Sequence, residues 1–330
     1  MPDRLLLGVE CDFCRRFIRF FVVILRGDFM SVKDMFLALC VVFIWGVNFV
    51  VIKVGLHEMP PFLLAGLRFL LVAFPAIFFI GLPKIPIRWL FAYGLTISFG
   101  QFSFLFLAIK LGMPAGIASL VIQSQAFFTI FFGVLLLSER CKWNHIAGVL
   151  VACIGMYLLA GASMNTQGND SITLGTLLLT LGAAVSWALG NIANKIILRN
   201  NQVSGIALVV WSSLVTVVPF FVCSWVFEGG AQVRESLLGV SAKTVGSLIY
   251  LSFFATILCY AAWGYLLGRY ETWRIAPLSL LVPVVGIASA KLLLDEMLSG
   301  EQVLGAFIVV LGLLLNTFGS RFPLARWVRG

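Results

Sequence analysis

The sequence predicts an all-α membrane protein of ten transmembrane helices, arranged as two inverted five-helix repeats with both termini in the cytoplasm. Three observations lead to this fold: an apolar composition, ten continuous apolar segments, and residue spacings that recur in the two halves. Of the 330 residues, 61% are hydrophobic and 11% are charged, and the mean hydropathy is +1.05. Soluble proteins carry about a quarter charged residues. The composition therefore excludes a soluble enzyme, a disordered chain and a secreted disulfide scaffold.

The ten apolar segments follow one another with short polar turns between them. A helix crosses the hydrocarbon core in about 20 residues, so the chain has room for about ten spans and for no folded soluble domain. The segments are continuous rather than alternating, which excludes a β-barrel. The predicted spans are Met35–Lys53, Pro61–Ile80, Trp89–Ile109, Ala115–Leu137, Ile146–Gly161, Leu174–Leu198, Ile206–Phe227, Val245–Gly268, Ala276–Leu294 and Val303–Gly319.

The distribution of Lys and Arg predicts the orientation. With these spans, 17 of the 23 basic residues lie on the side of the N-terminus, 3 lie on the opposite side and 3 lie within spans. Positive charge accumulates in cytoplasmic loops, so both termini are expected in the cytoplasm. The net charge of +9 then reflects these loops and not a nucleic-acid partner.

Two spacings recur in the halves. Trp45 and Lys53 match Trp187 and Lys195, eight residues apart in each half, and Glu139 matches Glu296, each followed by glycines nine and sixteen residues later. Five spans per half is an odd number, so the second half enters the membrane from the opposite side. We therefore predict a first repeat at 30–162, a second repeat at 163–330, and an N-terminal extension at 1–29 that precedes the natural start at Met30.

Arg68 is the sharpest candidate for a substrate contact. It lies about seven residues into a span, where a charged side chain costs about 2.5–3.5 kcal/mol on insertion scales. Such a residue usually faces a wet cavity or a partner, and a guanidinium can hold a substrate carboxylate through two parallel hydrogen bonds. The alternative is a side chain that extends back to the membrane interface.

Six further polar or aromatic residues fall near the middle of spans. The amides of Gln101 and Gln123 offer donors and acceptors suited to a zwitterion, or they hold helices together. The pairs Trp45 with Asn48 and Trp187 with Asn191 each share a helix face and either line a cavity or pack against neighbouring helices. For Lys53 and Lys195, which lie at helix ends, we expect side chains that reach lipid headgroups.

Glu139, Glu296 and Pro283 are gating or structural candidates. The two glutamates end helices on opposite faces of the membrane, where they cap helices, lie at the interface or form gates. Pro283 removes a backbone hydrogen bond within a span, whereas the first repeat has Ala126 at the matching position. No metal site and no cofactor site is expected, since the cysteines lie mostly within apolar runs.

The sequence resembles a known family at these residues. FIWGVNFVVIKVGLHEMPPFLLAGLRFLLVAFPAIFF at 43–79, GMPAGIASLVIQSQAFFTIFFGVLLLSER at 112–140 and GRYETWRIAPLSLLVPVVGIASAKLLLDE at 268–296 are similar to the EamA family of the drug/metabolite transporter superfamily. The resemblance covers 30–330. It implies ten helices, cytoplasmic termini, and an exporter of cysteine and O-acetylserine in the bacterial inner membrane.

The function expected is therefore secondary transport by alternating access, with a small amino-acid metabolite as substrate and lipid as surroundings. A monomer suffices, since one duplicated chain supplies both halves. The alternatives are a carrier of other metabolites within the same superfamily or, less favoured, a channel. An enzyme is disfavoured, because no HExxH, GxSxG or phosphate-binding motif occurs and the two histidines lie in or beside loops.

Overall fold

The computed structural model describes residues 30–164, 172–201, 203–270 and 275–319. Within these ranges every regular element is helical and there is no strand. Eight helical segments are long and apolar enough to cross a membrane: Val32–Glu58, Pro61–Phe78, Ile87–Lys110, Ala115–Leu137, Leu174–Asn200, Gly205–Glu228, Ala242–Arg269 and Gly300–Phe318. The shorter apolar helices Trp143–Leu159 and Leu278–Leu294 fall on the two other predicted spans. The all-helical membrane fold is confirmed, and the count of ten spans stays a prediction.

Several spans consist of two or three helical pieces of different winding. The main helices are α2 (Val32–Glu58), α3 (Pro61–Ala73), α4 (Ile87–Tyr93), α5 (Gln101–Lys110), α6 (Ala115–Val121), α7 (Gln125–Leu137), α8 (Trp143–Met164), α9 (Leu174–Asn200), α10 (Gly205–Cys223), α11 (Gly230–Leu238), α12 (Ala242–Ile249), α13 (Cys259–Arg269), α15 (Val282–Leu294) and α16 (Gly300–Phe318). The 3-10 segments are η2 (Ala76–Phe78), η4 (Ile122–Ser124) and η7 (Ala276–Leu281), and the π-helical segments are η3 (Gly94–Gly100), η5 (Ser224–Glu228) and η6 (Tyr250–Leu258).

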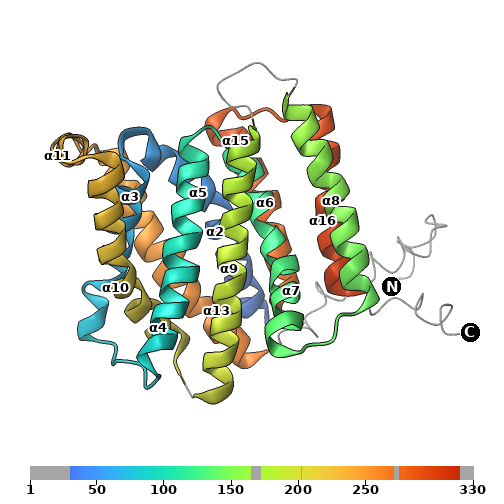
Figure 1. Cartoon of the computed structure of the whole chain (residues 1–330), viewed down its shortest axis with the longest axis horizontal. Helices are drawn as coiled ribbons and strands as arrows, with labels where there is room; N and C mark the ends of the chain where they lie inside the picture. The colour runs from blue at the N-terminus through green and yellow to red at the C-terminus, as the bar shows by residue number, and fades with distance from the viewer. Residues whose placement is uncertain (1–29, 165–171, 202, 271–274, 320–330) are drawn as a thin grey trace, which may run out of the picture.

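The helices lie side by side, with α8 and α16 paired at one edge and the short α11 at the opposite edge (Figure 1). Helix α11 lies in the connection between Gly205–Glu228 and Ala242–Arg269, whereas the connection between Pro61–Phe78 and Ile87–Lys110 in the first half contains no helix. The predicted extension at 1–29 lies outside the described residues.

A close contact joins α8 to α16 through glycines. A Cβ added to Gly148 would lie 2.7 Å from the Gly312 carbonyl oxygen, and one added to Gly155 would lie 2.7 Å from the Gly305 carbonyl oxygen. Residues of α8 therefore pair with residues of α16 in reverse order, so the two helices are antiparallel. Small residues let membrane helices approach this closely.

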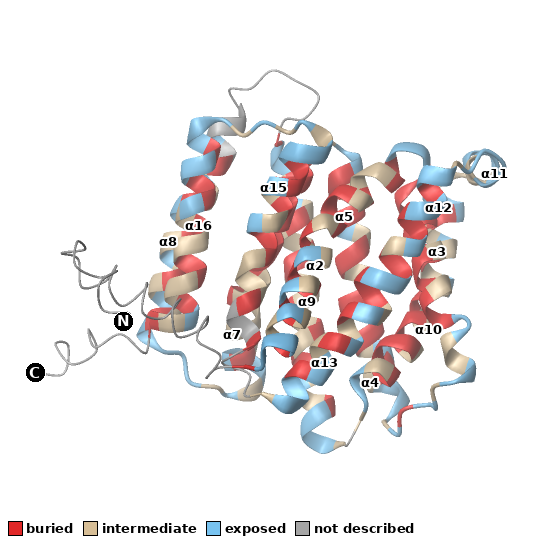
Figure 2. Cartoon of the chain, turned by 180° about the vertical axis from the view of Figure 1, so that it is seen from behind, coloured by how far each residue is buried: buried red, intermediate tan, exposed pale blue. Residues whose placement is uncertain are grey.

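Burial follows the environment expected for a membrane protein. The inward faces are buried while the outer faces of α8, α16 and α10 are exposed (Figure 2). Large apolar side chains cover these outer faces, among them Leu150, Ile154, Phe307 and Val218. Apolar patches of this extent are unusual on soluble monomers and match contact with lipid tails.

The same departures from α-helical winding occur at matching places in both halves. A shift of 157 residues carries the π-helical η3 onto η6 and the 3-10 segment η4 onto the end of η7. Pro283 is buried in the first turn of α15, directly after η7. Ala126 occupies the corresponding place in α7 after η4, so the change from 3-10 to α-helix does not require proline.

Candidate functional site

Arg68 lies inside the helix bundle. It is the eighth residue of α3 and is 3% exposed. Its Nη2 donates to Thr256 Oγ1 at 2.9 Å, whereas Nε and Nη1 have no hydrogen-bond partner. The side chain therefore stays in the bundle and does not extend to the interface, which answers the question that the sequence left open.

Arg68 borders a narrow cavity. The residues that line it come from α3, α4, η3, α5, α10, η6 and α13: Arg68, Phe69, Tyr93, Ile97, Ser98, Phe102, Val209, Ser212, Thr256 and Tyr260. The volume that the centre of a water molecule can occupy in this cavity is about 10 Å³, close to the minimum needed to hold one water molecule. No acidic residue is among the lining residues. The guanidinium is thus a buried cation without a carboxylate partner in this cavity.

Two aromatic rings partly replace a counter-ion for the Arg68 guanidinium. The guanidinium carbon of Arg68 lies 4.2 Å from the centroid of the Phe102 ring and 5.5 Å from that of Phe69. A cation over an aromatic face is stabilised by about 0.5–2 kcal/mol, the most when desolvated. This stabilisation is smaller than the cost of burying an unpaired charge. An anion bound beside Arg68 would therefore stabilise the site further.

The sequence did not single out Tyr93, Thr256 and Tyr260. Hydroxyl-bearing residues are common in apolar helices, so their presence gives no signal of depth or direction. Ser98 precedes Gln101 by three residues, a spacing that places two side chains on one face of an α-helix, but Ser98 lines the cavity and Gln101 is not among its lining residues. The π-helical η3 lies between them, and its wider turn changes which neighbours share a face.

Asn48 and Gln101 are buried and incompletely bonded. They are 8% and 5% exposed, and Asn48 Oδ1 and Gln101 Oε1 have no hydrogen-bond partner. Buried polar atoms are nearly always paired, so these two acceptors are exceptions that fit a donor supplied by a ligand.

The other predicted contacts are engaged between helices. Gln123 Nε2 donates to the Ser279 carbonyl at 3.2 Å, and Asn191 Nδ2 donates to Gln125 Oε1 at 2.8 Å. The indole of Trp45 donates to the Ala255 carbonyl at 3.0 Å, and Trp187 packs against the hydrophobic core. These contacts join spans to one another, and none of them needs a substrate.

The recurring charged residues meet in pairs. Lys53 forms an ion pair with Glu296 at 2.9 Å, and Lys195 forms one with Glu139. Each pair joins the two halves of the chain. The expectation that both lysines reach lipid headgroups was wrong, because each of them pairs with a glutamate. The sequence did not reveal these pairs, since the glutamates are far away in sequence and come close only in the fold.

An identical turn places both glutamates. Ser138 and Asp295 adopt left-handed conformations with φ of 54° and 53° at the ends of α7 and α15. The next residue then donates its backbone N–H to a carbonyl six residues back, from Glu139 to Gly133 and from Glu296 to Ala290, both at 3.2 Å. This is the usual way in which a left-handed residue closes a helix. Glu296 also accepts from the backbone N–H groups of Ala115 and Gly116 at the start of α6, so it caps a helix as the sequence allowed.

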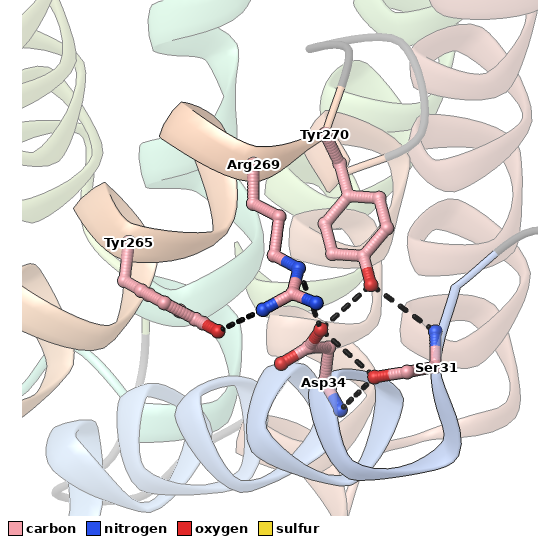
Figure 3. Close-up of polar contacts among 5 residues, drawn as sticks. All are labelled: Ser31, Asp34, Tyr265, Arg269 and Tyr270. Carbon is pink, nitrogen blue, oxygen red and sulfur yellow. Dashed lines mark hydrogen bonds and ion pairs between the residues drawn. The ribbon is translucent and has the colours of Figure 1, made fainter.

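A third polar cluster joins the start of α2 to the end of α13 (Figure 3). Asp34 Oδ2 accepts from Tyr270 Oη at 2.6 Å and from Ser31 Oγ at 2.8 Å, and Arg269 Nε lies 3.5 Å away. Tyr265 Oη accepts from Arg269 Nη1 at 2.6 Å. Asp34 is 6% exposed. The sequence gave no warning of this cluster, because Asp34 at the head of an apolar helix is also a normal first-turn residue.

Among the residues that the structure describes, no group of three or more His, Cys, Asp and Glu side chains is placed to hold a metal ion.

Known proteins are similar along nearly the whole chain. Residues 32–161 and 174–318 match the EamA-like transporter family. A probable amino-acid metabolite efflux pump of Salmonella typhimurium strain LT2 is 58% identical over 293 residues, which cover 88% of this chain and 97% of that protein. A protein of the same description from Escherichia coli strain K12 is 56% identical over 294 residues, 89% of this chain and 97% of that protein.

A solved crystal structure is similar in fold. It has a TM-score of 0.61 at 20% sequence identity and covers 88% of this chain and 99% of that one. At this identity the likeness concerns the fold alone. Together with the apolar spans, these similarities make the chain a multi-pass protein of the bacterial inner membrane. The chain belongs to the EamA-like transporter family of the drug/metabolite transporter superfamily.

Proposed function

We propose that this protein exports small amino-acid metabolites, cysteine and O-acetylserine among them, by alternating access. The observation that carries the proposal is Arg68, a buried guanidinium with Nε and Nη1 unpartnered in a cavity lined by no acid. A substrate carboxylate would supply the missing negative charge and accept these hydrogen bonds, which are the stronger for being charge-assisted. The two relatives described as amino-acid metabolite efflux pumps support this class of substrate.

The same proposal gives a role to the unpaired amide oxygens. Asn48 Oδ1 and Gln101 Oε1 are acceptors without a donor, and an amino acid brings an ammonium group with three donors. Arg68 would then select the carboxylate; Asn48 and Gln101 do not line the cavity beside it in this conformation, so they would reach the ammonium only after the helices move. Gln123, Asn191, Trp45 and Trp187 would hold the walls of the site through their contacts between helices.

We further propose ten spans in two inverted repeats, with both termini cytoplasmic. The antiparallel glycine contact of α8 with α16, the two equivalent turns at Glu139 and Glu296, and the excess of basic residues on the N-terminal side support it. Inverted repeats give two equivalent conformations that open to opposite sides. In the conformation described, the cavity beside Arg68 holds about one water molecule, so helices must separate to admit a substrate.

The transporter is proposed to act as a monomer without a cofactor. The cavity is built by residues of both halves of a single chain, Arg68 and Tyr93 from the first and Thr256 and Tyr260 from the second. The glutamate pairs and Pro283 are proposed to control which end is open.

Arg68→Gln tests the proposal. In inside-out membrane vesicles, export appears as uptake, and we expect cysteine uptake at low concentration to fall at least about tenfold. Hydrogen bonds to charged groups contribute about 1.5–3 kcal/mol, and 1.4 kcal/mol is tenfold in affinity. Arg199→Gln, at an exposed position of α9, is the matched control and should leave uptake unchanged.

The charge of the substrate provides the second arm. Unlabelled cysteine should compete with labelled cysteine in the wild type, whereas cysteinamide, which lacks the carboxylate, should not. Uptake by Arg68→Gln at the wild-type rate, in vesicles that contain equal amounts of protein, would remove Arg68 from the site.

A further inference from the structure

The π-helical segment η6 holds Arg68 at two points. Ser252 Oγ donates to the backbone carbonyl of Arg68 at 3.0 Å, and Thr256 Oγ1 accepts from Arg68 Nη2 at 2.9 Å. Ser252 and Thr256 are 0% and 2% exposed. The backbone and the side chain of the buried arginine are therefore both fixed by one short segment of a neighbouring span.

The winding of η6 decides which way the Thr256 hydroxyl points. Its single hydrogen is donated to the carbonyl of Leu251, five residues earlier, at 2.7 Å. Because a hydroxyl has one hydrogen and two lone pairs, the oxygen can only accept from Arg68. Thr256 consequently has no hydrogen left to give to a substrate, and its effect on one must pass through the guanidinium.

The guanidinium is restrained in two independent ways. The Phe102 ring, whose centroid lies 4.2 Å from its central carbon, packs against it and limits its movement toward α5. The hydrogen bond from Nη2 to Thr256 holds one of its terminal nitrogens in place. Nε and Nη1 are then the nitrogens without partners.

We propose that Thr256 is a positioning residue for substrate recognition: it anchors Nη2 so that Nε and Nη1 of Arg68 stay free for the carboxylate. This inference rests on the proposed function of Arg68. It also assigns a purpose to the π-helical winding of η6, since π-helical turns are rare and are frequent at functional sites.

Thr256→Val tests this directly, because valine keeps the branched shape and loses the acceptor. Measured as uptake of labelled cysteine into inside-out vesicles, the apparent KM should rise about tenfold, while the maximal rate per transporter stays within about twofold. Thr256→Ser keeps the hydroxyl and should restore an apparent KM near that of the wild type. Thr180→Val is the matched control, since Thr180 is a buried threonine whose hydroxyl donates to Thr176 in its own helix.

A double variant separates positioning from general damage. Once Arg68→Gln has removed the guanidinium, adding Thr256→Val should raise the apparent KM no further, because interacting residues are not additive. An additional increase of similar size in the double variant would show that Thr256 acts through the structure of the helix and would overturn the proposal.

The outcomes also separate this inference from the proposed function. If Arg68→Gln raises the apparent KM and Thr256→Val leaves it unchanged, Arg68 binds substrate without Thr256 and this inference fails alone. If neither variant changes it, the proposed role of Arg68 fails as well. Should Thr256→Val not reach the membrane, Thr256→Ala removes the same acceptor with less bulk, and the same two outcomes decide.

Discussion

The two ends of the molecule carry equivalent ion pairs in unequal surroundings. In the Lys53–Glu296 pair the side chains are 25% and 6% exposed, whereas in the Lys195–Glu139 pair they are 46% and 33% exposed. Removing one partner of a buried pair costs several kcal/mol, while exposed pairs contribute about 0–1 kcal/mol. The same residue types, placed by the same turn, therefore stabilise the two ends to different degrees.

The helices beside these pairs differ in the same direction. Near the middle of α2, seven residues before Lys53, the helix approaches α15 so closely that a Cβ on Gly46 would lie 2.5 Å from the Val285 side chain. At the equivalent contact between α9 and α7, Asn191 instead donates to Gln125 and to Thr129 Oγ1 at 3.2 Å. Close packing at a glycine thus joins α2 to α15, whereas side-chain hydrogen bonds join α9 to α7.

Further carboxylates join helices to one another at the Lys53 end. Glu58, at the end of α2, accepts from the Thr244 hydroxyl at 2.6 Å, and Glu228 accepts from the backbone N–H of Leu63 at 3.1 Å. Both bonds lie near helix starts, where negative charge is favourable. Each glutamate ties the end of one span to the beginning of another.

The largest change in the free energy of unfolding is expected at the close contact, or seam, between α8 and α16. This seam joins one helix of the first half to one helix of the second. Gly155→Leu inserts a side chain where even a Cβ would lie 2.7 Å from the Gly305 carbonyl oxygen and the Val309 nitrogen. We expect a loss of about 3 kcal/mol, at the upper end of overpacking effects, measured by SDS-induced unfolding of the purified protein. Gly161→Leu, where a Cβ meets nothing within 4 Å, is the control, and equal stability of the two variants would contradict a close seam.

The next largest effect is expected for Glu296→Gln. It removes the charge that pairs with Lys53 and caps α6 through Ala115 and Gly116, so unfolding should become easier by about 2 kcal/mol. The same measurement on Glu139→Gln should give less than about 1 kcal/mol, because that pair is partly exposed. A difference in the reverse order would contradict the inequality of the two ends.

The sequence allowed the spans and the recurring charged residues to be predicted because periodicity, depth and spacing are local properties. Arg68 was found in this way, since any charge within an apolar segment is conspicuous. The partners of Lys53 and Lys195 were not found, because each pair joins residues from different halves, 243 positions apart in the case of Lys53 and Glu296. Thr256 and Tyr260 were missed for a related reason: their importance comes from facing Arg68 and from the π-helical winding of η6, neither of which leaves a pattern in composition.

The most direct test of alternating access is to measure the separation of both ends in the same protein. In a variant without native cysteines, spin labels at His57 and Met297 report the Lys53 end, and labels at Arg140 and Arg199 report the Lys195 end; all four positions are exposed. We expect saturating O-acetylserine to move the two distance distributions in opposite directions, with the His57–Met297 separation increasing as the Arg140–Arg199 separation decreases. Distributions that stay fixed, or that widen and narrow together in protein that still transports, would contradict two inverted halves that open in turn.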